Sequence, residues 1–250
     1  LPTAKMQPEI GVKTLTSVAK TTKFRYLEAY NKLATETSYP SFYELSTPLT
    51  TIMKHKFHDW FDGNDIDTAR WTQTNHNAPT NAMIDAIDEG YELKCNATNN
   101  SDTKLHFNQK RQYDPVASVI ISVWKQQTIG GPALLGVGLM NSNTQLTVAT
   151  STDSAFVRAF PDSNANFNLF TADATTESGT SSAVAVDQSF HVHKVECGAS
   201  NIKYYIDGVL KVTKTTNRPT VKMEPIVYCG STGGSTARDL RIRYIEAYDV

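Results

Sequence analysis

The sequence has 250 residues, with 24 basic and 25 acidic residues and a formal net charge of −1. This length can bury a sizeable core, either as one large all-β domain or as two small ones. The even charge balance lacks the basic excess typical of nucleic-acid binding, and the sequence has no run of about eighteen apolar residues. We therefore expect neither a nucleic-acid partner nor membrane insertion.

The chain begins with segments that repeat its closing segments. Residues 2–8 match residues 219–225 at five of seven positions, and residues 25–31 match residues 243–249 at five of seven. The two blocks are collinear, which excludes coincidence. Internal repetition of this kind indicates that the first residues imitate the closing strands of a domain.

We therefore predict an N-terminal β arm and linker over residues 1–56, followed by the main domain. A second copy of the closing strands cannot occupy the same place in the same sheet, and an isolated hairpin is only marginally stable in water. The arm must pack against its own domain or add to the sheet of a neighbouring subunit. We favour the second arrangement, which predicts a homo-oligomer joined through the arm.

The rest of the chain has short alternating or β-branched segments separated by clusters of Gly, Asn, Asp, Ser and Thr, as in an all-β domain. Asp207-Gly208, between Ile206 and Val209, predicts a tight hairpin. Residues 173–187 are rich in polar residues and are expected to form an exposed loop. The expected strands cover residues 90–96, 118–125, 134–140, 146–150, 155–160, 167–172, 190–198, 202–206, 209–213, 225–229 and 240–248.

Two motifs mark the main domain. Residues 57–71 contain an aromatic and acidic opening followed by D-G-x-x-[LI]-D-x-x-[KR]-W, and residues 190–209 contain H-x-V followed by Y-x-D-G. Both resemble the concanavalin-A-like superfamily, which includes laminin-G-like modules, legume lectins and family-16 glycoside hydrolases. The resemblance implies that residues 57–250 form a two-sheet antiparallel jelly-roll sandwich, with Trp60 and Trp71 of the opening motif in its core.

The sequence offers no catalytic set of the family-16 type. Those hydrolases carry an E-x-D-x-E strand, whose alternation places the acidic groups on one face. The nearest string here contains Asp85 and Asp88, which are three positions apart and would face opposite sides of a strand. We therefore expect no glycosidase or lyase activity and predict that the protein is not an enzyme.

An oxygen-rich loop could hold Ca²⁺, the only cofactor that the sequence suggests. Its candidate ligands are Asp62, Asn64, Asp65 and Asp67, and hard oxygen ligands around a glycine turn suit this ion. Turn chemistry alone also accounts for these residue types, so the metal site stays one of two interpretations.

His191 and His193 would share one face of a strand and could bind a metal, but the sequence places no further ligand beside them. Packing at the strand edge is the favoured interpretation of this histidine pair.

The candidate ligand-binding residues lie on one strand. Ser118, Ser122 and Trp124 alternate with apolar residues and would share a face, where a Trp platform with small polar groups could bind a sugar. Packing of Trp124 in the core or at the rim is the alternative, and it is the favoured interpretation of this residue.

The chain has three cysteines at wide spacing, each in a strand-like segment. We expect buried free thiols, with a disulfide between Cys197 and Cys229 as the alternative.

These observations favour a non-enzymatic structural or attachment protein of an extracellular assembly, such as a virion appendage or shell, a surface layer or a repetitive adhesin. Its expected location is extracellular, on a cell surface or on a virion, and a cell-surface glycan is a candidate partner. A dedicated lectin-like carbohydrate-binding module is the first alternative, and a divergent glycoside hydrolase is the weaker one.

Overall fold

The computed structural model describes residues 54–61, 65–77, 79–83, 90–97, 101–127, 133–141, 153–160, 164–174, 176–231 and 237–250. Every regular element in these ranges is a β-strand, and they contain no helix of the length and hydrophobicity needed to span a bilayer. The predicted N-terminal arm, the string with Asp85 and Asp88, and the expected strand at 146–150 lie outside these residues. The arm and the homo-oligomer therefore stay predictions.

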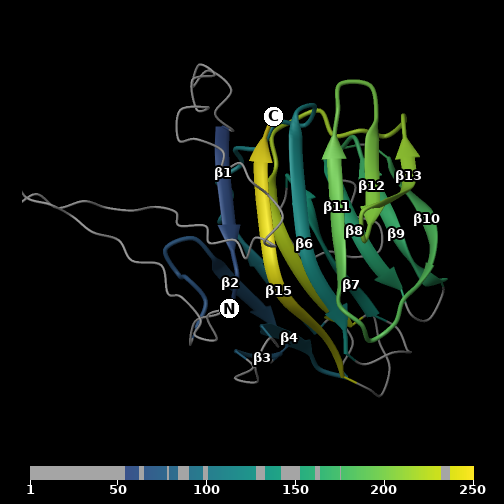
Figure 1. Cartoon of the computed structure of the whole chain (residues 1–250). Coiled ribbons are helices and arrows are strands. Elements are labelled where there is room, and N and C mark those ends of the chain that lie inside the picture. The colour runs from purple at the N-terminus through teal and green to yellow at the C-terminus, as the bar shows by residue number, and fades with distance from the viewer. Residues whose placement is uncertain are drawn as a thin grey trace, which may run out of the picture. The chain divides into compact units, whose positions relative to one another are not determined.

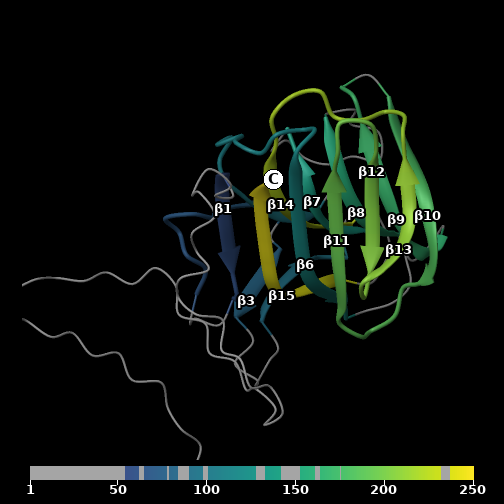
Figure 2. The same ribbon diagram turned by 45° about the horizontal axis from the view of Figure 1, so that its top comes forward.

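The described strands form two antiparallel sheets packed face to face as a jelly-roll sandwich. In Figures 1 and 2, one layer lies in front and the other behind it. The front layer, sheet A, has eight strands in the order β13 (Val209–Lys214), β12 (Ile202–Ile206), β11 (His191–Cys197), β6 (Ser118–Gln126), β15 (Arg238–Asp249), β4 (Tyr91–Cys95) and β3 (Thr80–Met83), with β1 (Lys54–Asp59) also paired to β15.

The rear layer, sheet B, has seven strands. Their order is β10 (Glu177–Ala185), β9 (Asn164–Ala172), β8 (Ser154–Phe160), β7 (Ala133–Met140), β14 (Glu224–Ser231), β5 (Asp102–His106) and β2 (Thr72–His76). The two strands nearest the end of the sequence, β14 and β15, therefore lie in the interior of sheets B and A. The predicted hairpin joins β12 to β13, and Asp207 and Gly208 both have positive φ, 50° and 79°, as its two-residue turn requires.

The main core lies between the sheets and follows strand alternation. On β6, Ile120 and Trp124 point inward, and the Trp124 ring contacts Phe167 of sheet B edge to face, with centroids 5.5 Å apart. Trp71 is 1% exposed and packs against Phe57, which confirms the prediction for Trp71.

Trp60 was predicted to be a core residue, and this is wrong, because it is 59% exposed. Its ring packs on Tyr244 on the outside of sheet A, with centroids 4.3 Å apart. The chain turns directly after β1, where the Phe61 N–H donates to the Asp59 carboxylate and Phe61 has a φ of 47°. Phe61, and not Trp60, thereby enters the core.

The expected strands need further corrections, since β2, β3 and β5 were not among them. Residues 54–56, expected in the linker, begin strand β1, and the expected loop at 173–187 contains strand β10. Strand β10 is an edge strand with a register irregularity between Ser181 and Ala185, and most of its residues are exposed or half-buried. Polar and small residues suit such an exposed edge, so composition alone indicated a loop.

Candidate functional site: the outer face of sheet B

Aromatic rings lie close against glycines on the outer face of sheet B, the side that points away from sheet A. On β7, a Cβ atom on Gly136 would lie 2.4 Å from Cε1 of Phe156, and one on Gly138 would lie 2.7 Å from Cδ2 of the same ring. Phe170 covers Gly179 in the same way, at 2.6 Å. At Gly136 and Gly138, glycine is required because backbone atoms of β8 and the Phe156 ring together occupy the space of a side chain.

The Phe156 ring belongs to a second buried apolar cluster that is separate from the core between the sheets. Its members come from β7, β8 and β14 and are almost completely buried: Leu134, Met140, Phe156, Ile226 and Tyr228. The outer face of sheet B is therefore a packed surface at its centre, and its accessible groups lie toward its two sides.

On the β10 side of this face, Arg158 of β8 forms a two-point ion pair with Glu177 of β10. Nη1 and Nη2 each donate to one carboxylate oxygen at 2.6 Å. The Arg158 side chain is fully buried, whereas that of Glu177 is 11% exposed. The guanidinium also lies over the Phe170 ring at 4.3 Å. The pair thus fixes the orientation of a carboxylate that stays in contact with solvent.

A second cation lies near Glu177. Lys214, at the edge of sheet A, donates from Nζ to the backbone carbonyl of Ser178, which directly follows Glu177. Burial lowers the pKa of Lys214, and the charge of Glu177 partly opposes this shift. Glu177 therefore sits in a positive electrostatic environment created by Arg158 and Lys214.

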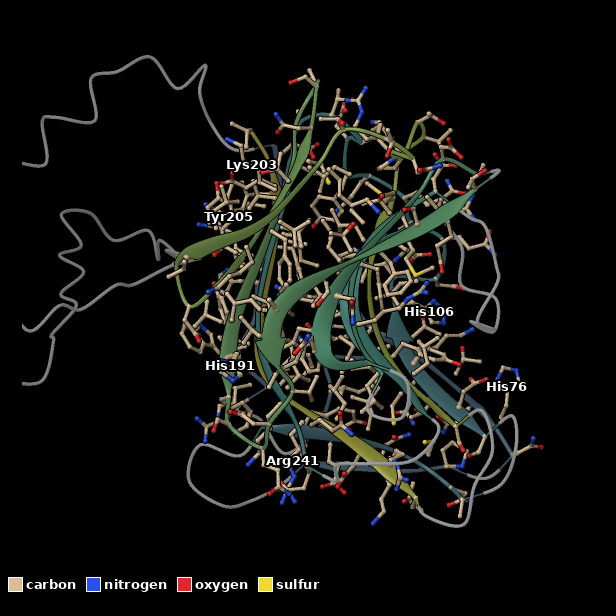
Figure 3. The ribbon with its side chains drawn as sticks, turned by 90° about the vertical axis from the view of Figure 1, so that its right-hand side faces the viewer. His76, His106, His191, Lys203, Tyr205 and Arg241 are labelled. Atoms are coloured by element: carbon tan, nitrogen blue, oxygen red, sulfur yellow. The ribbon has the colours of Figure 1, made fainter. Side chains whose placement is uncertain are left out.

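The opposite side of the face carries a histidine that is held neutral. The backbone N–H of Asn108 donates to Nδ1 of His106 at 2.9 Å, so the ring proton is on Nε2, which lies 2.8 Å from Oγ1 of Thr74. Burial, with a smaller contribution from Lys104, lowers the pKa of His106 to about 4. His106 and the nearby His76 lie on the sheet B side in Figure 3, away from His191.

Two further carboxylates lie on this side. Nδ1 of His76 is 2.8 Å from Oδ1 of Asp102, whose Oδ2 is buried with no hydrogen-bond partner. Burial raises the pKa of Glu224, although the N–H of Gln109 donates to both of its carboxylate oxygens. A raised pKa is a property that a general acid needs.

Three outer-face carboxylates therefore come from three strands: Asp102 from β5, Glu177 from β10 and Glu224 from β14. Strands β9, β8 and β7 separate Glu177 from Glu224, which at about 4.8 Å per strand is about 19 Å. Glycoside hydrolysis by two carboxylates requires a separation of about 5–9.5 Å. Asp102 and Glu224 are therefore too far from Glu177 to act with it, and a second catalytic group would have to be another residue.

The predicted ligand-binding residues lie elsewhere. Ser118, Ser122 and Trp124 do share one face of β6, but it is the inner face of sheet A, where their exposures are 0%, 3% and 0%. The Trp124 ring stacks on His193 with centroids 4.7 Å apart. A glycan could reach these side chains only if the two sheets moved apart, so the alternative of core packing accounts for their positions.

Of the predicted calcium ligands, Asp62 and Asn64 lie outside the described residues. Asp65 accepts a hydrogen bond from the backbone N–H of Ile66, and Asp67 accepts one from that of Ala69 and pairs with Arg70 at 3.2 Å. These are turn contacts. Within the described ranges no three His, Cys, Asp or Glu side chains gather as a metal site, and this includes His191 and His193.

No protein-family model matches the sequence, and no curated protein matches it. Solved structures match the fold. The Bacillus licheniformis β-glucanase has a TM-score of 0.56 at 13% identity, over 78% of this chain and 98% of its own. The transglycosylase Crh5 has a TM-score of 0.59 at 11% identity, over 78% and 84%. A pseudo-β-1,3-glucanase of Mycobacterium tuberculosis has a TM-score of 0.55 at 14% identity, over 78% and 98%.

The fold is the concanavalin-A-like jelly roll, which confirms the resemblance that the sequence indicated. The prediction of a non-enzymatic structural or attachment protein is contradicted by the same comparisons. Structures that share this fold include one described as a β-glucanase, one as a transglycosylase and one from a study of endo-acting O-glycanases. At 11–16% sequence identity, this structural similarity shows that the fold is shared and no more.

Sequence reasoning missed the outer face of sheet B. One signal was present: Gly136 and Gly138 stand two positions apart in an otherwise apolar strand, a spacing that places both on one face. The ion pair of Arg158 and Glu177 carries no comparable local signal, because it depends on the register of three strands.

Proposed function

We propose that the protein is a divergent glycoside hydrolase or transglycosylase whose glycan substrate contacts the outer face of sheet B near Glu177. The observation that carries this proposal is the two-point pair of Arg158 with a solvent-contacting Glu177 beside the Phe170 ring. A fixed carboxylate next to an aromatic ring is the combination that sugar chemistry uses, because the ring stacks on a pyranose while the carboxylate reacts.

In this proposal Glu177 acts either as the nucleophile that attacks the anomeric carbon or as the base that removes a proton from the attacking water. Arg158 positions it through both carboxylate oxygens, which leaves few orientations available to the carboxylate. The distances along sheet B argue against Asp102 and Glu224 as its partner, so the proton donor is assigned to neither. The glucanase and transglycosylase activities of the structural neighbours support a glucan as the first substrate class to test.

The experiment measures reducing ends and product lengths after incubation with a β-1,3-glucan, a mixed-linkage β-glucan and mucin O-glycans. Longer oligosaccharides would indicate transglycosylation, and shorter ones hydrolysis. The test variant is Glu177→Gln, which should lower the rate by about 100-fold or more. The matched control is Glu196→Gln on sheet A, where Glu196 pairs with Lys194.

Circular dichroism establishes that both variants keep the β-sheet fold. If Glu177→Gln retains the rate of the Glu196→Gln control, Glu177 is not the reacting carboxylate. If the unmodified protein releases no product from any of the three substrates, glucanase-type activity is contradicted.

A further inference from the structure

Two buried cysteines from opposite sheets meet at one carbonyl oxygen. Cys95 ends β4 in sheet A, and Cys229 lies in β14 of sheet B. Both are 0% exposed, and their Sγ atoms lie 3.5 Å and 3.3 Å from the backbone oxygen of Arg238. Arg238 stands opposite Cys95 in the register of β4 and β15, so this convergence is built into the strand pairing.

Both sulfur atoms approach the same carbonyl oxygen, so they lie near each other between the two sheets. The neighbouring Cys229 thiol lowers the pKa of Cys95, and burial raises the pKa of Cys229. A disulfide of about 2.05 Å requires the two side chains to rotate away from the shared oxygen and toward each other.

We propose that Cys95 and Cys229 form a disulfide bond that joins sheet A to sheet B. This modification site is independent of the proposed activity. Cys197 is not part of it, since Cys197 lies on β11 against Ser118, where burial raises its pKa to about 12. All three thiols are free and buried in this structure, as the sequence predicted. The alternative pairing of Cys197 with Cys229 is not supported, because Cys229 shares the Arg238 oxygen with Cys95.

The bond forms by exchange with a low-molecular-weight disulfide such as oxidised glutathione. The thiolate of Cys95 attacks one glutathione sulfur, makes a mixed disulfide and expels one glutathione thiolate. Cys229 then loses its proton to solvent and attacks the Cys95 sulfur of that mixed disulfide, which expels the second glutathione. The two cysteines are oxidised and one oxidised glutathione is reduced to two thiols. Since both sulfurs are buried in the fold, the exchange takes place during folding.

The test refolds the reduced 250-residue protein with and without a glutathione redox buffer and then counts titratable thiols in denaturant. The expected result is one free thiol instead of three, a mass loss of about 2 Da, and a peptide pair linking Cys95 to Cys229. Cys197→Ser is the matched control and should show the same mass loss. Cys95→Ser and Cys229→Ser should each abolish it.

Three free thiols in a protein with native circular dichroism would overturn the proposal, as would a bond that contains Cys197. A second measurement compares thermal midpoints. The bond closes a long loop in the unfolded chain, so the oxidised protein should unfold about 5–10 °C higher than the reduced one. An equal or lower midpoint would contradict a disulfide that fits the native sheets.

Discussion

Nδ1 of His193 lies 2.8 Å from the hydroxyl of Tyr204, and both side chains are buried between the sheets. His193 also stacks on Trp124, so it is packed on two sides by aromatic rings. Burial lowers the pKa of His193 to about 3. His106 on the other sheet is also held neutral by burial. Both histidines therefore stay neutral in the folded protein at pH values where a histidine of the unfolded chain is already protonated.

The first prediction is that stability falls with acidification from pH 6.5 to 5. An unfolded histidine takes up a proton near pH 6.5, but folded His193 and His106 do so only near pH 3 and 4. Each histidine should therefore lower the unfolding free energy with a slope that rises from about 0.7 kcal/mol per pH unit at pH 6.5 to about 1.4 near pH 5. Urea denaturation measures the slope, and His193→Gln should reduce it by one histidine's share. A free energy of unfolding that is flat over this window would contradict the burial of both rings.

His191 should behave in the opposite sense. Burial opposes its protonation, but the contacts of Nδ1 with Asp207 at 2.7 Å and of Nε2 with Asp187 at 3.1 Å outweigh burial and raise its pKa. Its stabilising contribution is complete below the unfolded pKa of about 6.5 and is lost as the pH rises through the folded pKa. NMR titration should show that Asp207→Asn lowers the pKa of His191 more than Asp187→Asn does. Equal shifts would show that the shorter contact is not the dominant one.

Arg158 and Glu177 should respond unequally to truncation. Glu177→Ala leaves a fully buried guanidinium without its carboxylate, whereas Arg158→Met leaves a carboxylate that water can reach. We expect a loss of about 3 kcal/mol of unfolding free energy for Glu177→Ala and a smaller loss for Arg158→Met. The double variant should be more stable than Glu177→Ala alone. Urea denaturation of the three variants tests this order. The reverse order would mean that leaving the Glu177 carboxylate without its partner costs more than leaving the Arg158 guanidinium without its partner.

The three tryptophans should differ in their access to quenchers. Trp60 is 59% exposed, whereas Trp71 and Trp124 are 1% and 0% exposed. Iodide should therefore quench one component of the fluorescence, and Trp60→Phe should remove that component at a cost below about 1 kcal/mol. Trp71→Ala should cost about 3–5 kcal/mol, because it empties a buried site. Iodide quenching that survives Trp60→Phe would place a second tryptophan at the surface.

Gly136 should not tolerate a side chain. A Cβ atom there would lie 2.2 Å from the backbone oxygen of Val157, in addition to its clash with the Phe156 ring. We expect Gly136→Ala to lower the unfolding free energy by about 1–3 kcal/mol. Phe156→Leu in the same chain should not restore it, because the tighter contact is with the backbone. Rescue by that second change would show that the ring alone sets the constraint.

Alternation in the sequence identified the strands whose inner residues are large and apolar. Strands β6, β7, β11 and β12 are of this kind. The Asp207-Gly208 turn predicted β13, which is the hairpin partner of β12. Strand β10 was missed because residues 178–182 are Ser, Gly and Thr, and a strand at the edge of a sheet can be formed by such small polar residues. The alternation of apolar and polar residues predicts a strand only where one face of that strand is buried against the other sheet.

The candidate site was less accessible to such reasoning. The alternation of β8 places Arg158 opposite to inward Val157, but nothing in that segment indicates which carboxylate it meets. Its partner depends on β9 lying between β8 and β10 and on the register of both pairings. Side-chain pairs that span two strands are properties of the folded sheet and carry no local pattern.

The placement of β14 and β15 has a consequence for synthesis of the protein. Strand β14 joins β7 to β5 in sheet B, and β15 joins β6 to β4 in sheet A, so each bridges two parts of a sheet that are otherwise unconnected. When the ribosome has translated residue 223, it has made all the described strands except β14 and β15. Neither of the two connecting strands is then present. The nascent chain then carries incomplete sheets with open edges that can pair with other chains. Closure of this sandwich therefore waits until residues 224–249 have left the ribosome.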